Sequence, residues 1–258
     1  MGRFDGATVL ITGTVGGLGS GAAKAFAAQG ARLVLSDLDE AALRDFAEAL
    51  DAETAILAGN VADEKLSEDL VGLAVEKFGR LDIAVNNAGI VHGFVRLPQV
   101  SSEEARRVLE VDLLGVFYAM KHQIPRMERQ FKENGRGGVI VNVASVAGLS
   151  GAPKLSVYAA AKHGVVGLTR SAAAEYATKG VRVNAVCPAH TRTAMVDGFV
   201  RSTGAAEADA LAELTRGVPM KRVAEVDEIT TGILFLADPA NSFMTGHALA
   251  LDGGIGAL

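Results

Sequence analysis

The sequence has little of several features on which other classes of protein depend. Among its 258 residues there is one cysteine, Cys187, and no tryptophan. A single thiol excludes a disulfide within the chain, so we expect a cytoplasmic protein and not a disulfide-stabilised secreted one. Cys187 ends an apolar run, which favours a buried structural thiol over a reactive one.

Long apolar stretches and clusters of positive charge are also missing. No apolar segment reaches the roughly 18 residues that a membrane-spanning helix requires. The first residues lack the apolar core and cleavage site of a signal peptide. The formal net charge is -5 and no basic run stands out, which argues against a nucleic-acid surface. We therefore expect neither a membrane nor a nucleic acid as a partner.

Apolar residues and glycines, by contrast, are plentiful. Hydrophobic residues make up 49% of the chain and charged residues 21%, so a core is easily filled and disorder is not expected. The length suits one large α/β domain. No proline-rich or serine-rich linker, low-complexity tract or internal repeat interrupts the chain, and we expect a single domain over residues 1–258.

Short apolar runs alternate with longer helical patterns along the chain. Continuously apolar strands are typical of a parallel sheet buried on both faces, and the alternation implies right-handed crossovers. We therefore predict an α/β fold, doubly wound, with a seven-stranded parallel sheet and helices on both faces. The predicted strands are Ala7–Thr12, Arg32–Asp37, Thr54–Asn60, Leu81–Gly89, Gly137–Ser145, Val181–Ala189 and His247–Gly254.

Two helical stretches are longer than the others, at about 102–131 and about 156–178. Ser101 or Ser102 precedes an acidic first turn and is expected to cap the first of them. The segment 190–219 breaks the rhythm, because it is longer than the other connections and carries mixed helical signals. Since it follows the sixth strand, we expect a lid near the carboxyl edge of the sheet.

A glycine-rich turn joins the first strand to the first helix. The stretch TGTVGGLGSG covers residues 12–21. Glycines let the backbone approach a pyrophosphate, and a helix N-terminus offers free N–H groups and a partial positive charge. The alternative, a turn without a ligand, is disfavoured because dinucleotide sites are built directly after a first strand. No Lys-Ser/Thr pair follows the glycines, which disfavours a nucleoside-triphosphate loop.

An acid ends the second strand. Asp37 stands where a carboxylate accepts hydrogen bonds from both ribose hydroxyls of an adenosine and repels a 2′-phosphate. No arginine or lysine adjoins it in LSDLD, so we expect NAD and not NADP as the cofactor. The alternative role of capping the next helix is better filled by Asp39.

The stretch SVYAAAKHG places Tyr158 and Lys162 one helical turn apart on the same face of a helix. Such pairs also occur by chance on solvated surfaces. A phenol ionises only near pH ~10, but a neighbouring ammonium favours the phenolate, which is a base for the proton that an alcohol loses on oxidation.

In this order, TGTVGGLG, NNAG and YAAAK resemble the motifs of the short-chain dehydrogenase/reductase family, and the resemblance covers nearly the whole chain, from about Gly6 to Gly254. It implies one Rossmann domain with seven parallel strands. It also implies hydride transfer between NAD(H) and a secondary alcohol or ketone. Family members are commonly tetramers built on the two long helices and the last strand, so we expect a homotetramer.

The family motifs assign roles to individual positions. The catalytic residues fall on Ser145, Tyr158 and Lys162, where the tyrosine is the base, the serine donates to the substrate oxygen and the lysine also bonds the nicotinamide ribose. The threonine that holds the nicotinamide amide falls on Thr193. The implied cofactor-binding residues are Gly13, Gly17, Leu18, Gly19, Asp37, Leu38, Asn60, Val61, Asn87, Tyr158, Lys162 and Thr193.

The chain also departs from the family pattern. Asn60 stands in place of an aspartate that meets the adenine amino group, and its amide oxygen can still accept that bond. Ala189 replaces a glycine after Pro188. Asp112 replaces a catalytic asparagine that helps hold a water behind the lysine. We expect Asp112 to keep that role or to shift the protonation of Lys162, with slower but real activity.

Two histidines follow strands near the expected substrate pocket. For His92 and His190 two interpretations stay open, a substrate contact and a surface-loop residue. Without an acidic partner or metal-ligand spacing they do not indicate a metal site. The loops 90–99 and 146–155 are mostly apolar, which favours a hydrophobic or mixed substrate without saying which alcohol or ketone it is.

Two other functions remain as alternatives. One is a 3-oxoacyl-carrier-protein-type reductase, against which Asp37 argues because such enzymes commonly prefer NADPH. The other is a non-catalytic NAD-binding regulatory protein, against which the complete set of Ser145, Tyr158 and Lys162 argues, while Asp112 keeps it open.

Overall fold

The computed structural model describes residues 2–257, apart from the side chain of Ser202. Within this range the strands form one seven-stranded sheet, in which neighbouring strands pair in parallel. The sheet confirms the predicted number and direction of strands. The strands are β1 (Thr8–Thr12), β2 (Arg32–Ser36), β3 (Thr54–Ile56), β4 (Ile83–Asn86), β5 (Gly138–Val143), β6 (Val181–Pro188) and β7 (Ala248–Leu251).

The strand order is β3-β2-β1-β4-β5-β6-β7. The chain runs from β1 outward to β3, returns to place β4 on the other side of β1, and then continues to the opposite edge. Between β1 and β4 the direction of winding reverses, and in open α/β sheets ligands bind outside the carboxyl ends of the strands at this point. The predicted doubly wound Rossmann fold is therefore confirmed.

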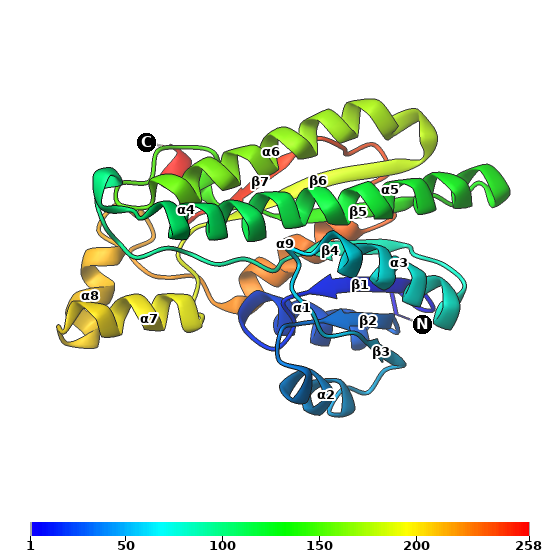
Figure 1. The fold of residues 1–258 in the computed structure, drawn as a ribbon, viewed down its shortest axis with the longest axis horizontal. Coiled ribbons are helices and arrows are strands. Elements are labelled where there is room, and N and C mark those ends of the chain that lie inside the picture. The colour runs from blue at the N-terminus through cyan, green and yellow to red at the C-terminus, as the bar shows by residue number, and fades with distance from the viewer. Residues whose placement is uncertain (1, 258) are drawn as a thin grey trace.

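Helices cover both faces of the sheet (Figure 1). Successive strand residues point to opposite faces, so Leu10 and Val34 join one apolar cluster while Val9 and Leu33 join the other. The first cluster is covered by α3 (Glu64–Phe78), α5 (Gly115–Asn134) and α6 (Ser156–Tyr176). The second is covered by α1 (Gly17–Ala27), α2 (Glu40–Glu48) and α9 (Val226–Ala237).

The first long helical stretch is not one regular helix. It consists of α4 (Ser102–Leu109), the π-helical segment η2 (Glu110–Leu114) and α5, which follow one another without a break. Of the two serines expected as a cap, Ser101 fills the role, because its hydroxyl accepts a hydrogen bond from the Glu104 N–H. Single π-helical turns are frequent at functional sites, and this one carries Asp112.

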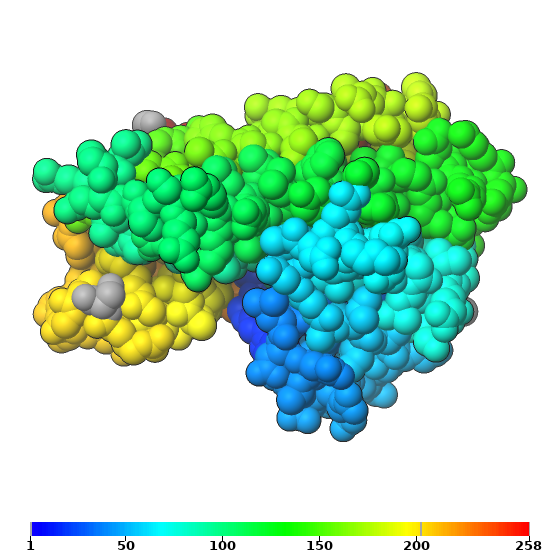
Figure 2. Space-filling model, in the orientation of Figure 1, coloured from blue at the N-terminus to red at the C-terminus, as the bar shows by residue number. Residues whose placement is uncertain are grey.

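The expected lid segment forms two helices, α7 (Ala194–Thr203) and α8 (Glu207–Leu214). They stand at the carboxyl end of the strands, and Figure 2 shows a notch between them and the part of the molecule around α2. The ring of Phe199 on α7 lies 4.7 Å from that of Phe94 in the loop after β4. The short 3-10 helices are η1 (Leu97–Gln99), η3 (Val146–Gly148), η4 (Ala177–Lys179) and η5 (Ile255–Ala257).

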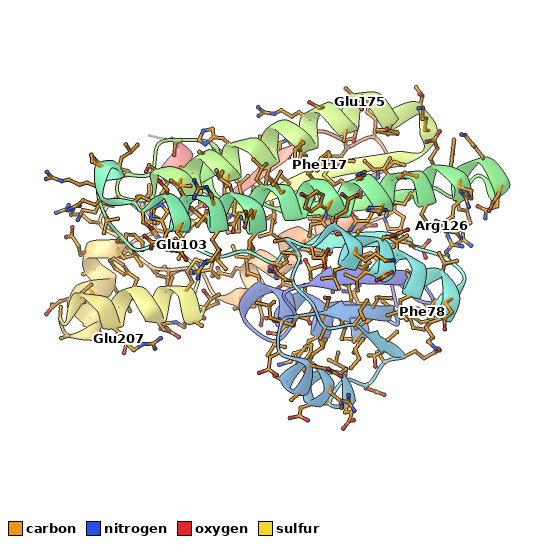
Figure 3. The ribbon with its side chains drawn as sticks, in the orientation of Figure 1. Phe78, Glu103, Phe117, Arg126, Glu175 and Glu207 are labelled. Atoms are coloured by element: carbon orange, nitrogen blue, oxygen red, sulfur yellow. The ribbon has the colours of Figure 1, made fainter. Side chains whose placement is uncertain are left out.

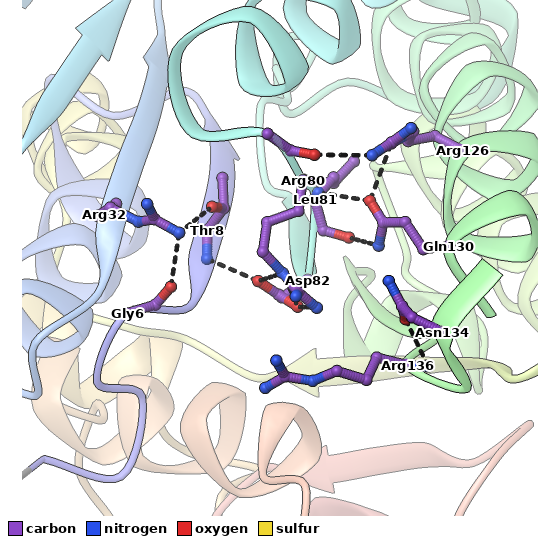
Figure 4. Close-up of polar contacts among 11 residues, drawn as sticks. Gly6, Thr8, Arg32, Arg80, Leu81, Asp82, Arg126, Gln130, Asn134 and Arg136 are labelled. Atoms are coloured by element: carbon purple, nitrogen blue, oxygen red, sulfur yellow. Dashed lines mark hydrogen bonds and ion pairs between the residues drawn. The ribbon is translucent and has the colours of Figure 1, made fainter.

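Hydrogen bonds and an ion pair stabilise the amino end of the sheet, opposite to the carboxyl end where the glycine turn lies (Figure 4). Asp82 accepts a hydrogen bond of 2.9 Å from the Thr8 N–H and pairs with Arg80. The Gln130 amide bonds both the N–H and the carbonyl of Leu81, at 2.8 Å each. These bonds satisfy backbone groups at the starts of β1 and β4, and they lie far from the glycine turn.

Candidate active site

The glycine turn between β1 and α1 requires glycine for two separate reasons. Gly13 and Gly17 have φ angles of 70° and 52°, which side chains rarely adopt. A Cβ atom on Gly19 would lie 1.9 Å from the Gly13 carbonyl oxygen, so α1 can approach the turn only without a side chain there. The first turn of α1 holds no acid, and Gly16 at its N-cap offers no side-chain acceptor. No side chain of the first turn therefore compensates the partial positive charge at the N-terminus of α1, which suits the binding of an anion.

Asp37 is built into this turn. Its carboxylate accepts hydrogen bonds from the N–H groups of Val15, at 2.8 Å, and Leu38, at 2.7 Å. Within residues 2–257 no arginine or lysine forms an ion pair with it. Asp39 caps α2 by accepting from the Ala42 N–H, as expected. Asp37 thus lies beside the turn without a cationic partner among the described residues, and its role as a ribose acceptor stays a prediction.

The NNAG stretch after β4 is tied to the end of β1. The Asn87 side chain donates to the carbonyls of Thr12 and Gly13, at 2.9 and 3.0 Å. The Thr12 hydroxyl accepts in return from the N–H groups of Asn87 and Ala88. This link between the ends of β1 and β4 through Thr12 was not predicted from the sequence, although a threonine directly before a glycine turn could have indicated it.

Two further cofactor candidates lie on the loop after β3. Asn60 is exposed, and its side-chain oxygen accepts a hydrogen bond of 3.0 Å from the Ala62 N–H. Val61 packs against α5, where a Cβ on Gly115 would lie 3.1 Å from it. The Asn60 oxygen therefore shapes its own loop, and it keeps a second lone pair for another donor.

Ser145 follows the end of β5, and Tyr158 and Lys162 lie in the first turns of α6. The Ser145 hydroxyl accepts from the Ala147 N–H and donates to the Pro188 carbonyl at 3.4 Å, a long bond. The Lys162 ammonium donates to the Val143 carbonyl at 3.1 Å and lies 5.5 Å from the centre of the Tyr158 ring. One strand end therefore anchors the lysine and carries the serine.

Asp112 reaches the same lysine from the π-helical segment. One carboxylate oxygen accepts a hydrogen bond of 2.8 Å from the Ile90 N–H, and the other lies 3.1 Å from the Lys162 ammonium. The Asp112 side chain is fully buried and that of Lys162 nearly so. A Cβ atom on Gly89 would lie 3.1 Å from Asp112 and 3.3 Å from Lys162, so glycine leaves room for the pair.

The ion pair decides the protonation of Lys162. Burial alone lowers the pKa of an ammonium, but attraction to Asp112 and Tyr158 outweighs it and raises the pKa of Lys162 above its ordinary value. The lysine therefore stays charged at neutral pH. The structure places Asp112 within ion-pair distance of Lys162, and its role in the reaction stays a prediction.

Thr193 lies at the start of α7, beside the glycine turn. It occupies the N-cap position of α7 but its side chain makes no capping bond, because its hydroxyl donates to the Thr191 carbonyl. A Cβ on Gly17 would lie 3.1 Å from its methyl group. The alternative of a simple helix cap is therefore wrong, and Thr193 faces the turn.

The two histidines differ in burial. His92 is only 3% exposed, so its interpretation as a surface-loop residue is wrong; its Nδ1 atom lies 2.7 Å from the Gly93 carbonyl oxygen, and its buried Nε2 atom has no hydrogen-bond partner among the described residues. His190 is partly buried, and this burial lowers its pKa. Cys187 is fully buried, which confirms the predicted buried thiol, and this burial raises its pKa to about 11.

Neither a metal centre nor a membrane span is visible in residues 2–257. No group of three or more His, Cys, Asp or Glu side chains is placed there to hold a metal ion. No helix in the same range is long and apolar enough to cross a bilayer.

Comparison with known proteins decides the family. A family model described as enoyl-(acyl carrier protein) reductase matches residues 13–256. The chain belongs to the short-chain dehydrogenase/reductase family. It is therefore an oxidoreductase that acts on the CH–OH group of an alcohol or on the matching carbonyl.

Several members of this short-chain dehydrogenase/reductase family match nearly end to end. The chain is 40% identical to an uncharacterized oxidoreductase of Thermotoga maritima, over 98% of both chains. It is 40% identical to a trans-4-hydroxycyclohexanecarboxylate dehydrogenase of Sinomonas cyclohexanicum, over 95% of this chain and 91% of that one. It is 37% identical to a cyclohexanol dehydrogenase of an Acinetobacter species, over 97% and 95%.

Two solved structures of short-chain dehydrogenases/reductases share the fold closely. Levodione reductase superposes with a TM-score of 0.93 and 35% identity, over 99% of both chains. The 3-ketoacyl-(acyl-carrier-protein) reductase from Brucella melitensis, complexed with NADH, superposes with a TM-score of 0.89 and 33% identity, over 98% of this chain and 99% of that one.

Proposed function

We propose that this protein is an NAD-dependent dehydrogenase of secondary alcohols built on an apolar six-membered ring. The observation that carries the proposal is the placement of Tyr158 beside a buried, charged Lys162 at the strand end that holds Ser145. We further propose a cytoplasmic homotetramer of single-domain subunits spanning residues 1–258, in which segment 190–219 serves as the lid.

The residues around the glycine turn fit a dinucleotide. The turn approaches α1 so closely that Gly19 admits no Cβ, and the bare N-terminus of α1 suits a pyrophosphate. We assign the adenosine ribose to Asp37 and the nicotinamide amide to Thr193. The remaining cofactor contacts in the proposal are Gly13, Gly17, Leu18, Leu38, Asn60, Val61, Asn87, Tyr158 and Lys162.

The chain's own residues handle the proton and the substrate oxygen. When bound, the nicotinamide supplies the hydride acceptor or donor. The Tyr158 oxygen takes the hydroxyl proton during oxidation and returns it during reduction. The Ser145 hydroxyl donates to the substrate oxygen, and its long bond to the Pro188 carbonyl is weak enough to be exchanged for this one. Lys162 stays charged beside Tyr158 and stabilises its phenolate.

The proposal of a ring-shaped substrate is supported by the names of two relatives and by the side chains expected to border the site. Two relatives carry cyclohexanol and 4-hydroxycyclohexanecarboxylate in their names. We propose His92 and His190 as substrate contacts. The segments expected to border the site expose large apolar side chains, which suit an apolar ring; these are Phe94, Leu97, Leu149, Met195 and Met220.

Initial rates with cyclohexanol and with trans-4-hydroxycyclohexanecarboxylate test the proposal. We expect NAD⁺ to be preferred over NADP⁺. Replacing Asp37 by Ser removes a charged acceptor and is expected to reduce this preference about 10- to 100-fold, since bonds to a charged group contribute about 1.5–3 kcal/mol. The variant Asp39→Ser keeps a helix cap and should leave the preference unchanged. A preference for NADP⁺ in the unaltered protein would contradict the proposal.

A second candidate is reduction of 3-oxoacyl groups on an acyl carrier. The Brucella melitensis reductase was solved with NADH, so an acid at position 37 is no argument against this substrate class. Acetoacetyl-coenzyme A separates the candidates. Reduction of this thioester faster than of cyclohexanone would replace the first proposal by the second.

The proposed tetramer rests on exposed apolar residues. α5 and α6 run side by side along one face, with Phe117 exposed near the start of α5 (Figure 3). Leu114, at the end of η2, is also exposed. Phe235 on α9 and the fully exposed Phe243, in the segment between α9 and β7, are further exposed apolar residues. Sedimentation equilibrium should give about 106 kDa, four times the chain mass of 26.6 kDa.

A further inference from the structure

We infer that Asp112 is a positioning residue that neutralises the Lys162 ammonium and thereby raises the pH at which Tyr158 becomes a phenolate. The proposed function enters this inference only through the role of Tyr158 as the base. The family motif has an asparagine at this position, and an amide carries no charge to oppose the lysine.

The geometry of the pair supports this role. Lys162 has three N–H donors. One serves the Val143 carbonyl at 3.1 Å, and the Asp112 carboxylate lies at the same distance. The centre of the Tyr158 ring lies 5.5 Å from the same ammonium. Tyr158 therefore lies beside a cation that already has a counter-charge in contact with it.

The pair is held together by its surroundings. Asp112 is fixed by the Ile90 N–H, and Gly89 has no side chain to come between the two charges. Both side chains are buried, so solvent ions screen their interaction little.

The remaining neighbours do not take over this role. Cys187 on β6 faces Lys162, and burial keeps its thiol neutral with a pKa of about 11. Ser145 and the Val143 carbonyl are uncharged. Among the described residues, no carboxylate other than Asp112 lies within ion-pair distance of Lys162.

This arrangement favours one direction of the reaction near neutral pH. Reduction of a carbonyl needs the protonated phenol as the acid, whereas oxidation of an alcohol needs the phenolate as the base. A Lys162 ammonium whose charge is balanced by Asp112 stabilises the phenolate less than an unpaired ammonium would. We therefore expect oxidation to require a higher pH than reduction.

The composition permits a direct test by near-ultraviolet titration. The chain has three tyrosines and no tryptophan, so the tyrosinate band is not masked by indole absorption. Subtracting the titration of a Tyr158→Phe protein isolates the band of Tyr158. We expect Asp112→Asn, measured against its own Tyr158→Phe double variant, to lower the midpoint by about one pH unit or more.

Two further variants keep the test decisive. Asp112→Ser also removes the charge and should lower the midpoint if Asp112→Asn does not fold, as judged by circular dichroism. Asp82→Asn is the matched control, because Asp82 also accepts a backbone N–H and pairs with a cation, but at the other end of the sheet. Its midpoint should equal that of the unaltered protein.

An unchanged or higher midpoint in the Asp112 variants would overturn the inference, and so would an equal shift in Asp82→Asn. The titration uses neither substrate nor cofactor. Failure to oxidise any ring alcohol would therefore refute the proposed function and leave this inference standing. An unchanged titration midpoint would refute the inference and leave the proposed function standing.

Discussion

At the scale of single residues, the buried pair of Asp112 and Lys162 is the feature on which the site depends most. Removing two charges from water is costly, and their attraction offsets this cost only when further bonds satisfy both partners. Here the Ile90 N–H bonds Asp112 and the Val143 carbonyl bonds Lys162, while the Asp112 Oδ2 atom has Lys162 as its ion-pair partner and no hydrogen bond among the described residues. We therefore expect the site to tolerate loss of the whole pair better than loss of one charge.

Replacing Lys162 by Met leaves Asp112 buried without a counter-charge. We expect the free energy of unfolding to fall by about 3–5 kcal/mol. The double variant Asp112→Asn/Lys162→Met removes both charges and should recover most of this loss. Urea unfolding at neutral pH measures all of these proteins. A double variant that is no more stable than Lys162→Met would show that the pairing does not matter.

Some of these residues could be placed from the sequence and others could not. The family motif puts Asp112 near Lys162, but their ion pair depends on the π-helical turn at 110–114, which hydrophobic periodicity does not reveal. The burial of His92 likewise depends on the path of the loop after β4, which the sequence pattern does not reveal. Both features depend on tertiary structure and not on local sequence.

At the scale of elements, the glycine turn is where sequence and structure agree most closely. The order of strand, glycines and helix was sufficient to predict an anion site, because only a turn with positive φ and no Cβ brings the helix N-terminus so near the strand. The ends of the strands were less predictable. Apolar residues continue past Ile56 into the loop after β3, so the apolar run was longer than the strand.

Two glycines in this turn are expected to respond differently to alanine. In Gly19→Ala the new Cβ meets the Gly13 carbonyl oxygen, and overpacking of this kind costs about 1–3 kcal/mol. In Gly16→Ala the Cβ meets nothing within 4 Å, and the φ of -149° suits any residue. Thermal unfolding should therefore occur at a clearly lower temperature for Gly19→Ala only. Equal effects of both substitutions would contradict the geometry of the turn.

At the scale of the whole molecule, the fold was predictable because the alternation of strands and helices repeats along the entire chain. The sheet separates two apolar clusters, and the strands serve both. The form of segment 190–219 was not predictable. α7 and α8 are positioned by distant contacts, such as the bridge between Thr191 and Ala224 and the Phe94–Phe199 ring contact.

The single thiol reports on the integrity of this fold. Cys187 is fully buried on β6, and burial raises its pKa to about 11. We expect a thiol reagent at pH ~8 to leave the native protein unmodified and to label it only as fast as it unfolds. Labelling followed by mass spectrometry at increasing urea concentration measures this. Rapid labelling without urea would place Cys187 outside the core.

The same thiol makes stability depend on alkaline pH. An unfolded cysteine ionises near pH ~8.5, so a raised pKa in the folded state stabilises the fold below that value. This contribution is lost as the pH rises through about 11. Against Cys187→Ala as the reference, the unaltered protein should lose stability over this interval. An unchanged difference between the two proteins would contradict the raised pKa.

The central claim is that Tyr158 carries the proton of an NAD-dependent alcohol oxidation. The most direct test is the initial rate of NAD⁺ reduction with cyclohexanol for the unaltered protein and for Tyr158→Phe, with NADH binding measured by fluorescence in both. We predict turnover in the unaltered protein and a loss of about 100- to 10,000-fold in the variant, with NADH still bound. Equal rates in the two proteins, or NADH binding without turnover in the unaltered protein, would contradict the account.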